Sequence, residues 1–306
     1  MLNDTCRSVR TCASSIRAGA ILVGAAMFCQ TPSVAQIEAG GDVRNPSPDV
    51  TSAVGWPDAT NTGAPDGVTL LPSGGIEITK AGTVISGLDI HGTVYIKAAN
   101  VTVKDCQITS NGWAVVQIQP GVTGAVVQDC TLNGTGSAPD GTGNQGIMGQ
   151  GTFLRNNIYN VENGITLQGN NTVIEDNYIH DLSAGGSPHY DGIQIDGGIS
   201  NLTIRHNTII NSHGSAGAIM IDNEFGPISN VTVDNNLLAG GSFTIYSDAK
   251  FNSNPITGVS ITNNHIASGQ YGPILFRGNS PNFTGNAYDG AVLLRTLKLN
   301  KSQAAR

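Results

Sequence analysis

The sequence predicts an all-β fold, a single-stranded parallel β-solenoid of about nine coils, and three observations support this prediction. A short apolar segment that ends in a polar turn recurs along the chain at a mean spacing of about 25 residues, which is typical of repeat architectures. Each repeat contains a second strand signal bounded by a Gly or Asn turn. Finally, 40 glycines with only 12% charged and 5% aromatic residues indicate many short strands joined by tight turns.

Residues 1–35 have the three parts of a secretory signal. Arg7, Arg10 and Arg17 make the first part positive, an apolar segment follows at 18–28, and Ser-Val-Ala at 33–35 is a small-residue cleavage site. The apolar segment of roughly eleven residues is shorter than the ~20 that span a bilayer. We therefore expect a secreted protein, extracellular or periplasmic, without stable membrane insertion.

The segments on either side of the repeats are expected to close the solenoid. Residues 36–75 contain several prolines and glycines and predict an irregular N-terminal cap. Residues 76–290 hold the coils, and residues 291–306, with four leucines and four basic residues, predict a C-terminal cap or tail. Such caps are needed because the first and last strands of a solenoid have open edges.

One position of each repeat holds a cysteine or an asparagine. That position is occupied by Leu88, Cys106, Cys130, Asn157, Asn177, Asn207, Asn236, Asn264 and Asn286. Stacked asparagines bond to the coils above and below, so we interpret this column as an internal amide ladder rather than a site. The two cysteines are expected on consecutive coils, about 4.8 Å apart. They can form either a pair of buried thiols or a disulfide.

The other strand of each repeat carries alternating apolar residues. These strands are predicted at 94–97, 116–119, 147–150, 165–168, 193–196, 219–222, 243–246 and 274–277. Pairs such as Ile193/Ile195 and Phe243/Ile245 should point inward and stack into the core. The residues between them face outward in two columns, one of which includes Lys97, Gln119, Gln150, Gln168, Asp196, Asp222, Tyr246 and Arg277.

Asp196 and Asp222 are therefore expected on adjacent coils of one exposed face. Like charges in parallel register repel each other, so a bound cation, a shared proton or a nearby base must favour the pair. The segments around these strands concentrate further reactive groups. These are His189, Tyr190 and Asp191 before the first acidic strand, His213 before the second, and Glu224, Lys250 and Arg277 after the strands.

The coil period and the asparagine column resemble those of the right-handed parallel β-helix proteins, the superfamily of pectate lyases, polygalacturonases, alginate lyases and mannuronan epimerases. The resemblance covers about residues 76–290 and implies a right-handed coil. The segment HYDGIQID at 189–196 resembles the strand-entry motif of polygalacturonases, which aligns Asp191 with a catalytic carboxylate. Ala216 and Gly217 stand where that family has paired aspartates, and Ser212-His213-Gly214 lies one coil early.

The resemblance implies a carbohydrate-active protein, and we favour a lyase or epimerase acting on a uronic-acid polysaccharide. Elimination on a uronic acid needs a base, an acid and a neutralised substrate carboxylate. The catalytic candidates are His189, Tyr190, Asp191, Asp196, His213 and Lys250. The substrate-binding candidates are Gln168, Gln194, Tyr246 and Arg277. Asp222 and Glu224 are the candidate metal ligands, for Ca²⁺ if a metal takes part.

Two other classes of function remain open. A glycoside hydrolase would need only paired carboxylates at a suitable separation, with no metal. A non-catalytic extracellular protein would use the same groove for polysaccharide binding alone. We expect no nucleic-acid partner, because no stretch of the chain is strongly basic, and we expect a monomer. Without residues 1–35 the chain has 12 basic and 21 acidic residues, a net charge of −9, so an anionic substrate would need local cations.

Overall fold

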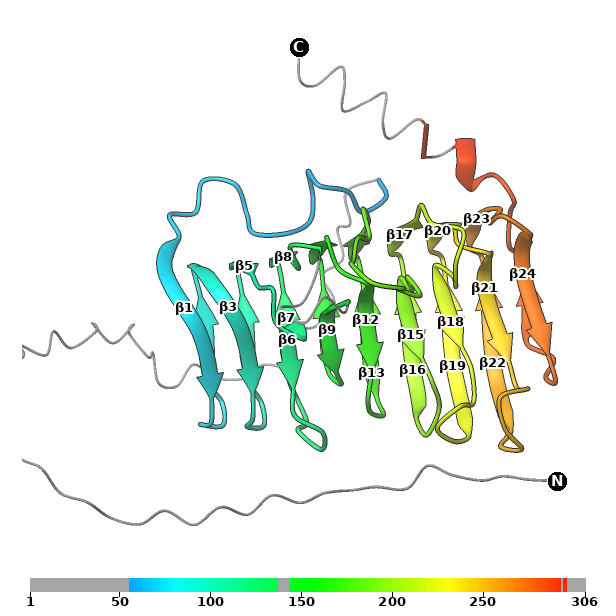
Figure 1. The fold of residues 1–306 in the computed structure, drawn as a ribbon, viewed down its shortest axis with the longest axis horizontal. Coiled ribbons are helices and arrows are strands. Elements are labelled where there is room, and N and C mark those ends of the chain that lie inside the picture. The colour runs from blue at the N-terminus through cyan, green and yellow to red at the C-terminus, as the bar shows by residue number, and fades with distance from the viewer. Residues whose placement is uncertain (1–54, 137–142, 293, 296–306) are drawn as a thin grey trace, which may run out of the picture. The chain divides into compact units, whose positions relative to one another are not determined.

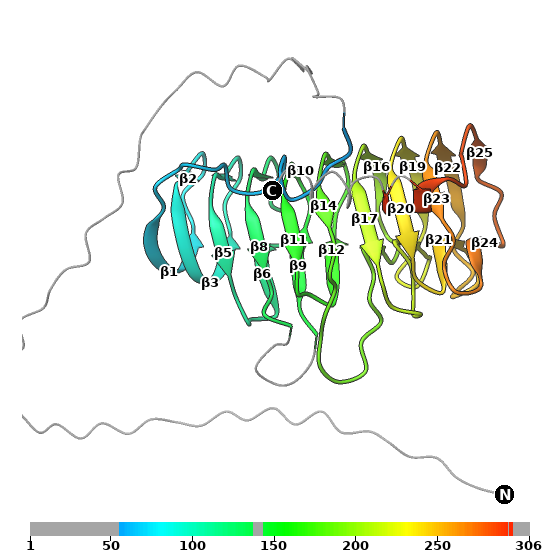
Figure 2. The same ribbon diagram turned by 90° about the horizontal axis from the view of Figure 1, so that it is seen from above.

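The structure is a computed structural model that describes residues 55–136, 143–292 and 294–295. The described residues form an all-β parallel β-helix, which confirms the predicted fold (Figure 1). Strands of successive coils pair in parallel, and they stack along the helix axis in Figure 2. The predicted signal peptide, residues 1–35, and the first part of the predicted N-terminal cap lie outside the described residues.

Each coil contributes strands to three faces. The first face contains β1 (Leu71–Ile78), β3 (Leu88–Ile96), β6 (Ala114–Ile118), β9 (Gln145–Gly149), β12 (Asn163–Leu167), β15 (Ile193–Ile195), β18 (Ile219–Ile221), β21 (Phe243–Asp248) and β24 (Gly272–Arg277). The second face contains β2 (Val84–Ser86), β4 (Thr102–Lys104), β7 (Val126–Gln128), β10 (Thr152–Leu154), β13 (Thr172–Glu175), β16 (Ser200–Arg205), β19 (Ile228–Asp234), β22 (Ile256–Thr262) and β25 (Asn282–Thr284). The third face contains β5 (Gln107–Thr109), β8 (Thr131–Asn133), β11 (Asn157–Tyr159), β14 (Tyr178–Ile179), β17 (Thr208–Asn211), β20 (Leu237–Gly240) and β23 (His265–Ala267).

The core follows the alternation of apolar residues along these strands. In β15 and β18, Ile193, Ile195, Ile219 and Ile221 are fully buried, and each isoleucine of β15 pairs with its counterpart in β18. Burying an isoleucine side chain contributes about 1.5–3 kcal/mol, so a stack of such residues fixes which face of each strand points inward. The predicted inward stacking is confirmed for these strands.

Six asparagines form the internal ladder, one on each coil. They are Asn156, Asn177, Asn207, Asn236, Asn264 and Asn286. From Asn177 onward, each side-chain oxygen accepts hydrogen bonds from the backbone N–H and the side-chain amide of the ladder residue one coil earlier, as Asn207 does from Asn177 at 2.9 and 3.0 Å. These bonds satisfy polar groups that lie within the core.

The sequence prediction was wrong at one position of the ladder, because Asn156 and not Asn157 occupies it. Asn157 begins β11, and its side-chain oxygen lies 2.8 Å from Nε2 of His180. Two consecutive asparagines made the alignment ambiguous. In the structure the ladder residue lies two positions before the buried Ile158, and residues two apart share a face of an extended strand.

Cys106 and Cys130 continue the ladder column into the first coils. Both are fully buried free thiols, and the backbone N–H of Cys130 donates to the side-chain oxygen of Asn156 at 3.1 Å. Of the two alternatives that the sequence left open, the structure therefore has the thiol pair.

Residues 55–70, which we call the N-terminal strap, lie along the third face (Figure 1, blue). The backbone N–H of Gly63 donates to the carbonyl of Arg155 at 2.8 Å, and the N–H of Ala64 donates to the hydroxyl of Thr131 at 3.0 Å. The strap therefore binds to coils in the middle of the rod, and the chain then enters the first coil through β1.

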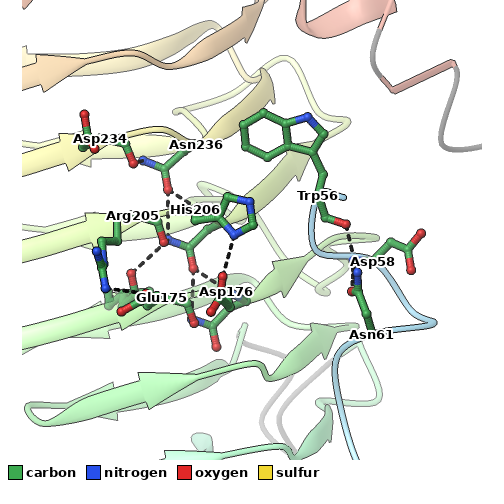
Figure 3. Close-up of polar contacts among 12 residues, drawn as sticks. Trp56, Asp58, Asn61, Glu175, Asp176, Arg205, His206, Asp234 and Asn236 are labelled. Atoms are coloured by element: carbon green, nitrogen blue, oxygen red, sulfur yellow. Dashed lines mark hydrogen bonds and ion pairs between the residues drawn. The ribbon is translucent and has the colours of Figure 1, made fainter. Parts of the chain in front are cut away.

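Trp56 anchors the start of the strap. Its ring stacks on His206 at a centroid distance of 5.3 Å and meets His265 edge-on at 5.2 Å. Each imidazole is in turn held by a carboxylate, Asp176 at 2.5 Å and Asp289 at 2.7 Å (Figure 3 shows Trp56, His206 and Asp176). The strap is thus fixed to two different coils by aromatic contacts.

We expect Trp56→Ala to loosen the strap and leave the rod intact. The substitution removes two ring contacts, each worth about 0.5–1.5 kcal/mol, while the ladder and the core are untouched. Hydrogen exchange should become faster in residues 56–64 and stay unchanged in β15 and β18. Val68→Ala, at an exposed strap residue, is the control and should change neither. Unchanged exchange in the strap of the Trp56 variant would show that the backbone bonds hold it without the ring.

The C-terminal end of the described chain has helical residues at 290–292 and 294–295. The rest of the predicted C-terminal cap lies outside the part of the chain that the structure describes. Among the described residues, no helix is long and apolar enough to cross a membrane.

Candidate functional site

A groove of about 560 Å³ crosses the outer side of the first face. It lies over β9, β12 and β15 and includes segments just before and after these strands. Its lining residues are Trp113, Gln145, Met148, Glu162, Asn163, Thr166, Leu167, Gln168, His189, Gln194, Asp196, Gly197, Gly198, Ile199 and Phe225. The predicted site residues His189, Asp196, Gln168 and Gln194 are among them. The lining includes two carboxylates and no lysine or arginine.

Asp196 begins a row of acidic residues that continues beyond the groove. The pairing of β15 with β18 puts Asp196 beside Asp222, as the sequence predicted. A further bridge pairs Asp222 with Asp248, and Asp248 pairs with Arg277 on the next coil. The row on successive coils is therefore Gln168, Asp196, Asp222, Asp248 and Arg277.

The prediction that Tyr246 belongs to this row was wrong. Ile219 pairs with Ile245, which shifts β21 by two residues and moves Tyr246 into the other outward column, beside Leu275. The sequence interpretation chose Phe243 and Ile245 as the inward pair because both are apolar. In the structure Ser247 is buried instead of Phe243, since its hydroxyl donates to the side chain of Asn279 at 2.8 Å.

No cationic side chain of the described residues is paired with Asp196 or Asp222, and the pKa values of both carboxyl groups are raised. Burial, followed by the negative charges of Asp222 and Glu224, raises the pKa of Asp196 to about 7. Burial also raises the pKa of Asp222 to about 6, although the N–H of Glu224 opposes the shift by donating to its carboxylate at 2.9 Å. One oxygen of Asp196, Oδ1, is buried and has no hydrogen-bond partner among the described residues. The pair therefore holds a shared proton near neutral pH.

Asp248, the next carboxylate of the row, has a cationic partner. Its carboxylate is 1% exposed and accepts a hydrogen bond from Nε of Arg277 at 2.8 Å. Arg277, a predicted substrate-binding residue, thus already has an acidic partner in this protein. The expectation that Asp222 lies on the exposed surface was wrong, because Asp222 is only 3% exposed.

Asp191 lies behind the groove rather than in its wall. It is 2% exposed, and the backbone N–H of Gly217 donates to its carboxylate at 3.3 Å. Burial raises the pKa of Asp191 well above its usual range, and the charges of Asp196 and Asp222 act in the same direction. Asp191 therefore interacts electrostatically with the acidic row, although it lies before β15 and Asp196 lies after that strand.

The histidines before the acidic strands have different surroundings. His189 is exposed in the groove wall, and its backbone N–H donates to Glu162 at 2.8 Å. His213 stacks on Tyr190 with ring centroids 3.6 Å apart, and its Nε2 lies 2.7 Å from the carbonyl of Leu182. The stacked pair connects the segment before β15 to the rod, and neither ring lines the groove.

Lys250 and Glu224 follow the acidic strands, and both are exposed. The backbone N–H of Lys250 donates to Asp248 at 3.1 Å, and its side chain does not line the groove. Within the described residues, no group of three or more His, Cys, Asp or Glu side chains is arranged to hold a metal. The Asp222 and Glu224 donors alone do not make up the six to eight oxygens that Ca²⁺ takes, so we base no chemical step on a metal.

Sequence reasoning did not single out Glu162 and Trp113, and it did not place Asp248 in the acidic row. Glu162 precedes β12 and was not singled out because its neighbours carry no reactive group. Trp113 and Phe225, which are 49% and 71% exposed, present aromatic surface to the groove. An exposed aromatic residue next to a strand is the signal that could have indicated Trp113 as a platform for a sugar ring. Asp248 was interpreted as a loop charge after the strand, because the two-residue shift of β21 was not apparent from the sequence.

Comparison with known proteins agrees with this architecture. The model of the family described as "Right handed beta helix region" matches residues 62–186 and 141–293. Among solved structures, the crystal structure of the Agl-KA catalytic domain is similar, with a TM-score of 0.52 and 17% sequence identity. The similarity covers 69% of this chain and 45% of that chain, so the present chain spans less than half of its length. No curated protein matches the sequence. At this identity the structural likeness is one of fold.

Proposed function

Because this chain belongs to the family of right-handed β-helix proteins, we propose that it is a glycoside hydrolase that cleaves a neutral polysaccharide in the groove of the first face. The observation that carries the proposal is the Asp196–Asp222 pair, whose pKa values of about 7 and about 6 leave one proton on two carboxyl groups. A carboxyl group that keeps its proton near neutral pH, in one groove with a second carboxylate, Glu162, is what acid–base hydrolysis of a glycosidic bond needs.

The proposed reaction uses the two carboxyl groups that line the groove, Asp196 and Glu162, in different roles. The protonated carboxyl of Asp196 donates its proton to the glycosidic oxygen, which leaves as a hydroxyl when its bond to the anomeric carbon breaks. The carboxylate of Glu162 takes a proton from the water that attacks the same carbon. The buried Asp222 helps to keep the proton on Asp196 through its charge.

The acidic lining favours a neutral substrate over a polyuronate. The groove has Glu162 and Asp196 and no lysine or arginine, so a polyanion would be repelled unless cations accompanied it. Trp113 and Phe225 offer apolar ring surface, and Gln168 and Gln194 offer amides that both donate and accept hydrogen bonds. This combination suits the hydroxyls and the apolar faces of a neutral sugar.

A lyase or epimerase acting on a uronic acid is the second candidate, and exposed His189 in the groove wall favours it as a base. This candidate needs Ca²⁺ or another cation to neutralise the substrate carboxylate, since Arg277 is paired with Asp248. The predicted signal peptide supports action outside the cytoplasm for either candidate, and a monomer is the expected form.

Incubation with a panel of neutral and acidic polysaccharides tests the proposal. New reducing ends from a neutral polymer, unaffected by chelator, are the expected result. An unsaturated product that absorbs in the ultraviolet, lost on addition of chelator, would replace the hydrolase by the lyase. A change in uronic-acid configuration without chain cleavage would indicate an epimerase. Binding without any product would leave a carbohydrate-binding protein.

The pH dependence of hydrolysis follows from the raised pKa of Asp196. Activity needs the proton on Asp196, so kcat/KM should fall as pH rises above about 7. A value of kcat/KM that stays unchanged from about pH 6 to about pH 9 would exclude Asp196 as the acid.

A further inference from the structure

A second pocket, of about 230 Å³, lies on the same face toward the N-terminal end of the rod. It is built on β1, β3 and β6 and the turn after β6. Its lining residues are Glu77, Tyr95, Lys97, Gln117, Gln119 and Pro120. None of these residues contributes to the acidic groove, so the pocket is a separate feature of the first face.

The charges in this pocket neutralise each other. Nζ of Lys97 lies 2.8 Å from the carboxylate of Glu77 and 5.8 Å from the ring centre of Tyr95. Tyr95 is 38% exposed and presents its ring to solvent beside this ion pair. The pocket therefore offers an aromatic surface without net charge, which favours an uncharged ligand over an anion or a cation.

The amides of Gln117 and Gln119 complete the pocket. Among the described residues, neither side chain takes part in a hydrogen bond, so both donors and both acceptors face solvent. A sugar hydroxyl is both a donor and an acceptor, and a primary amide matches both functions. An aromatic ring beside two open amides is a combination that binds one face and the edge of a sugar ring.

An uncharged track connects this pocket to the acidic groove. Strand pairing puts Gln119, Gln150, Gln168 and Asp196 on four successive coils of one outward column. Three steps of about 4.8 Å separate Gln119 from Asp196, a distance of about 14 Å. The neighbouring column contains, on the same successive coils, Gln117, Met148, Thr166 and Gln194. No charged side chain stands in either column between the pocket and Asp196.

We propose that the pocket of Tyr95, Gln117 and Gln119 is a second saccharide-binding site, which holds a distant part of the same neutral polymer that is cleaved at Asp196. That the polymer is cleaved rests on the proposed function. That the pocket binds a saccharide rests only on the pocket's own residues. A polymer that lies along the glutamine track reaches both sites, and a short oligosaccharide reaches only one. The second site therefore selects for long chains.

The test compares disaccharides and octasaccharides of neutral glucans and xylans as substrates for Tyr95→Ala. Loss of the aromatic surface should lower kcat/KM for octasaccharides about tenfold, through KM, and leave disaccharides within about twofold. Tyr95→Phe keeps the ring and should restore the wild-type value. Thr232→Ala, at an exposed position of β19 on the second face, is the matched control and should change neither substrate.

Calorimetric binding of the same octasaccharides separates failure of the site from failure of the proposed function. Binding that depends on Tyr95, in a protein that cleaves nothing, would uphold the site and overturn the hydrolase. Cleavage with equal effects of Tyr95→Ala on short and long substrates would overturn the site and leave the hydrolase. Absence of both binding and cleavage of octasaccharides, or preferred binding of acidic ones, would overturn the second site.

Discussion

Asp196→Asn is expected to abolish hydrolysis and, at about pH 8, to make the protein more stable. The variant has no proton to donate to the leaving group, so kcat should fall by about 10²–10⁴. The gain in stability has a separate origin, because Asp196 is held in a buried, acidic environment that disfavours its ionised form. A stabilised and inactive variant is typical of a catalytic group that the fold tolerates at a cost.

The direction of the stability change follows from proton linkage. The pKa of Asp196 rises from its ordinary 3.8 to about 7 on folding, so the folded state binds its proton more tightly than the unfolded state. The stability that this group contributes is fully present below its pKa in the unfolded state and is lost as pH rises through its folded-state pKa of about 7. Asparagine does not ionise, so the Tm advantage of the variant should be about 2 °C or more at about pH 8 and should shrink toward about pH 4.

Thermal unfolding at both pH values and an assay on the identified neutral substrate check this prediction. Asp66→Asn, at an exposed aspartate of the strap, is the matched control and should change neither activity nor the pH dependence of Tm. Full activity of the Asp196 variant would exclude Asp196 as the acid. An Asp196 variant that is less stable at about pH 8 would mean that its carboxylate has a favourable partner when ionised.

Asn207→Ala is expected to cause the largest loss of stability among the substitutions that we consider. The side chain of Asn207 is fully buried and bonds to Asn177, Asn236 and the carbonyls of Ile174 and Arg205. Its removal leaves buried donors and acceptors unpaired on neighbouring coils. We expect a loss of about 3–5 kcal/mol in the free energy of unfolding, measured by denaturant titration.

Asn157→Ala is the matched control for the ladder. It removes the same side chain from a half-buried position, where the contact is with His180 at 2.8 Å. The loss should be about 1 kcal/mol or less. Equal losses for the two variants would contradict the assignment of the ladder to Asn156 and Asn207, and a larger loss for Asn157 would restore the original alignment.

The sequence alone determined the fold, because a parallel β-helix repeats the same physical requirement in every coil. Each coil must bury apolar residues, as β15 does with Ile193 and Ile195 and β18 with Ile219 and Ile221. An asparagine also recurs at one buried position of successive coils. Errors in single coils do not change such a conclusion. The mistaken choice of Asn157 over Asn156 left the period and the pairing of Asp196 with Asp222 unaffected, although the sequence indicated two strands in each repeat and the structure has three faces.

Only the tertiary structure decided the composition of the site. The register of β21, which puts Asp248 beside Asp222, depended on the burial of Ser247, whose hydroxyl donates a hydrogen bond to Asn279. A pattern of apolar residues cannot reveal such a hydrogen bond. The grouping of Glu162, Trp113 and Phe225 in one groove with Asp196 depended on the paths of segments outside the repeat. The raised pKa values of Asp196 and Asp222 depended on burial and on acidic neighbours such as Glu224. Periodicity fixes which side chains point outward, whereas their charge states and neighbours are set by contacts between coils, which have no periodic signal in the sequence.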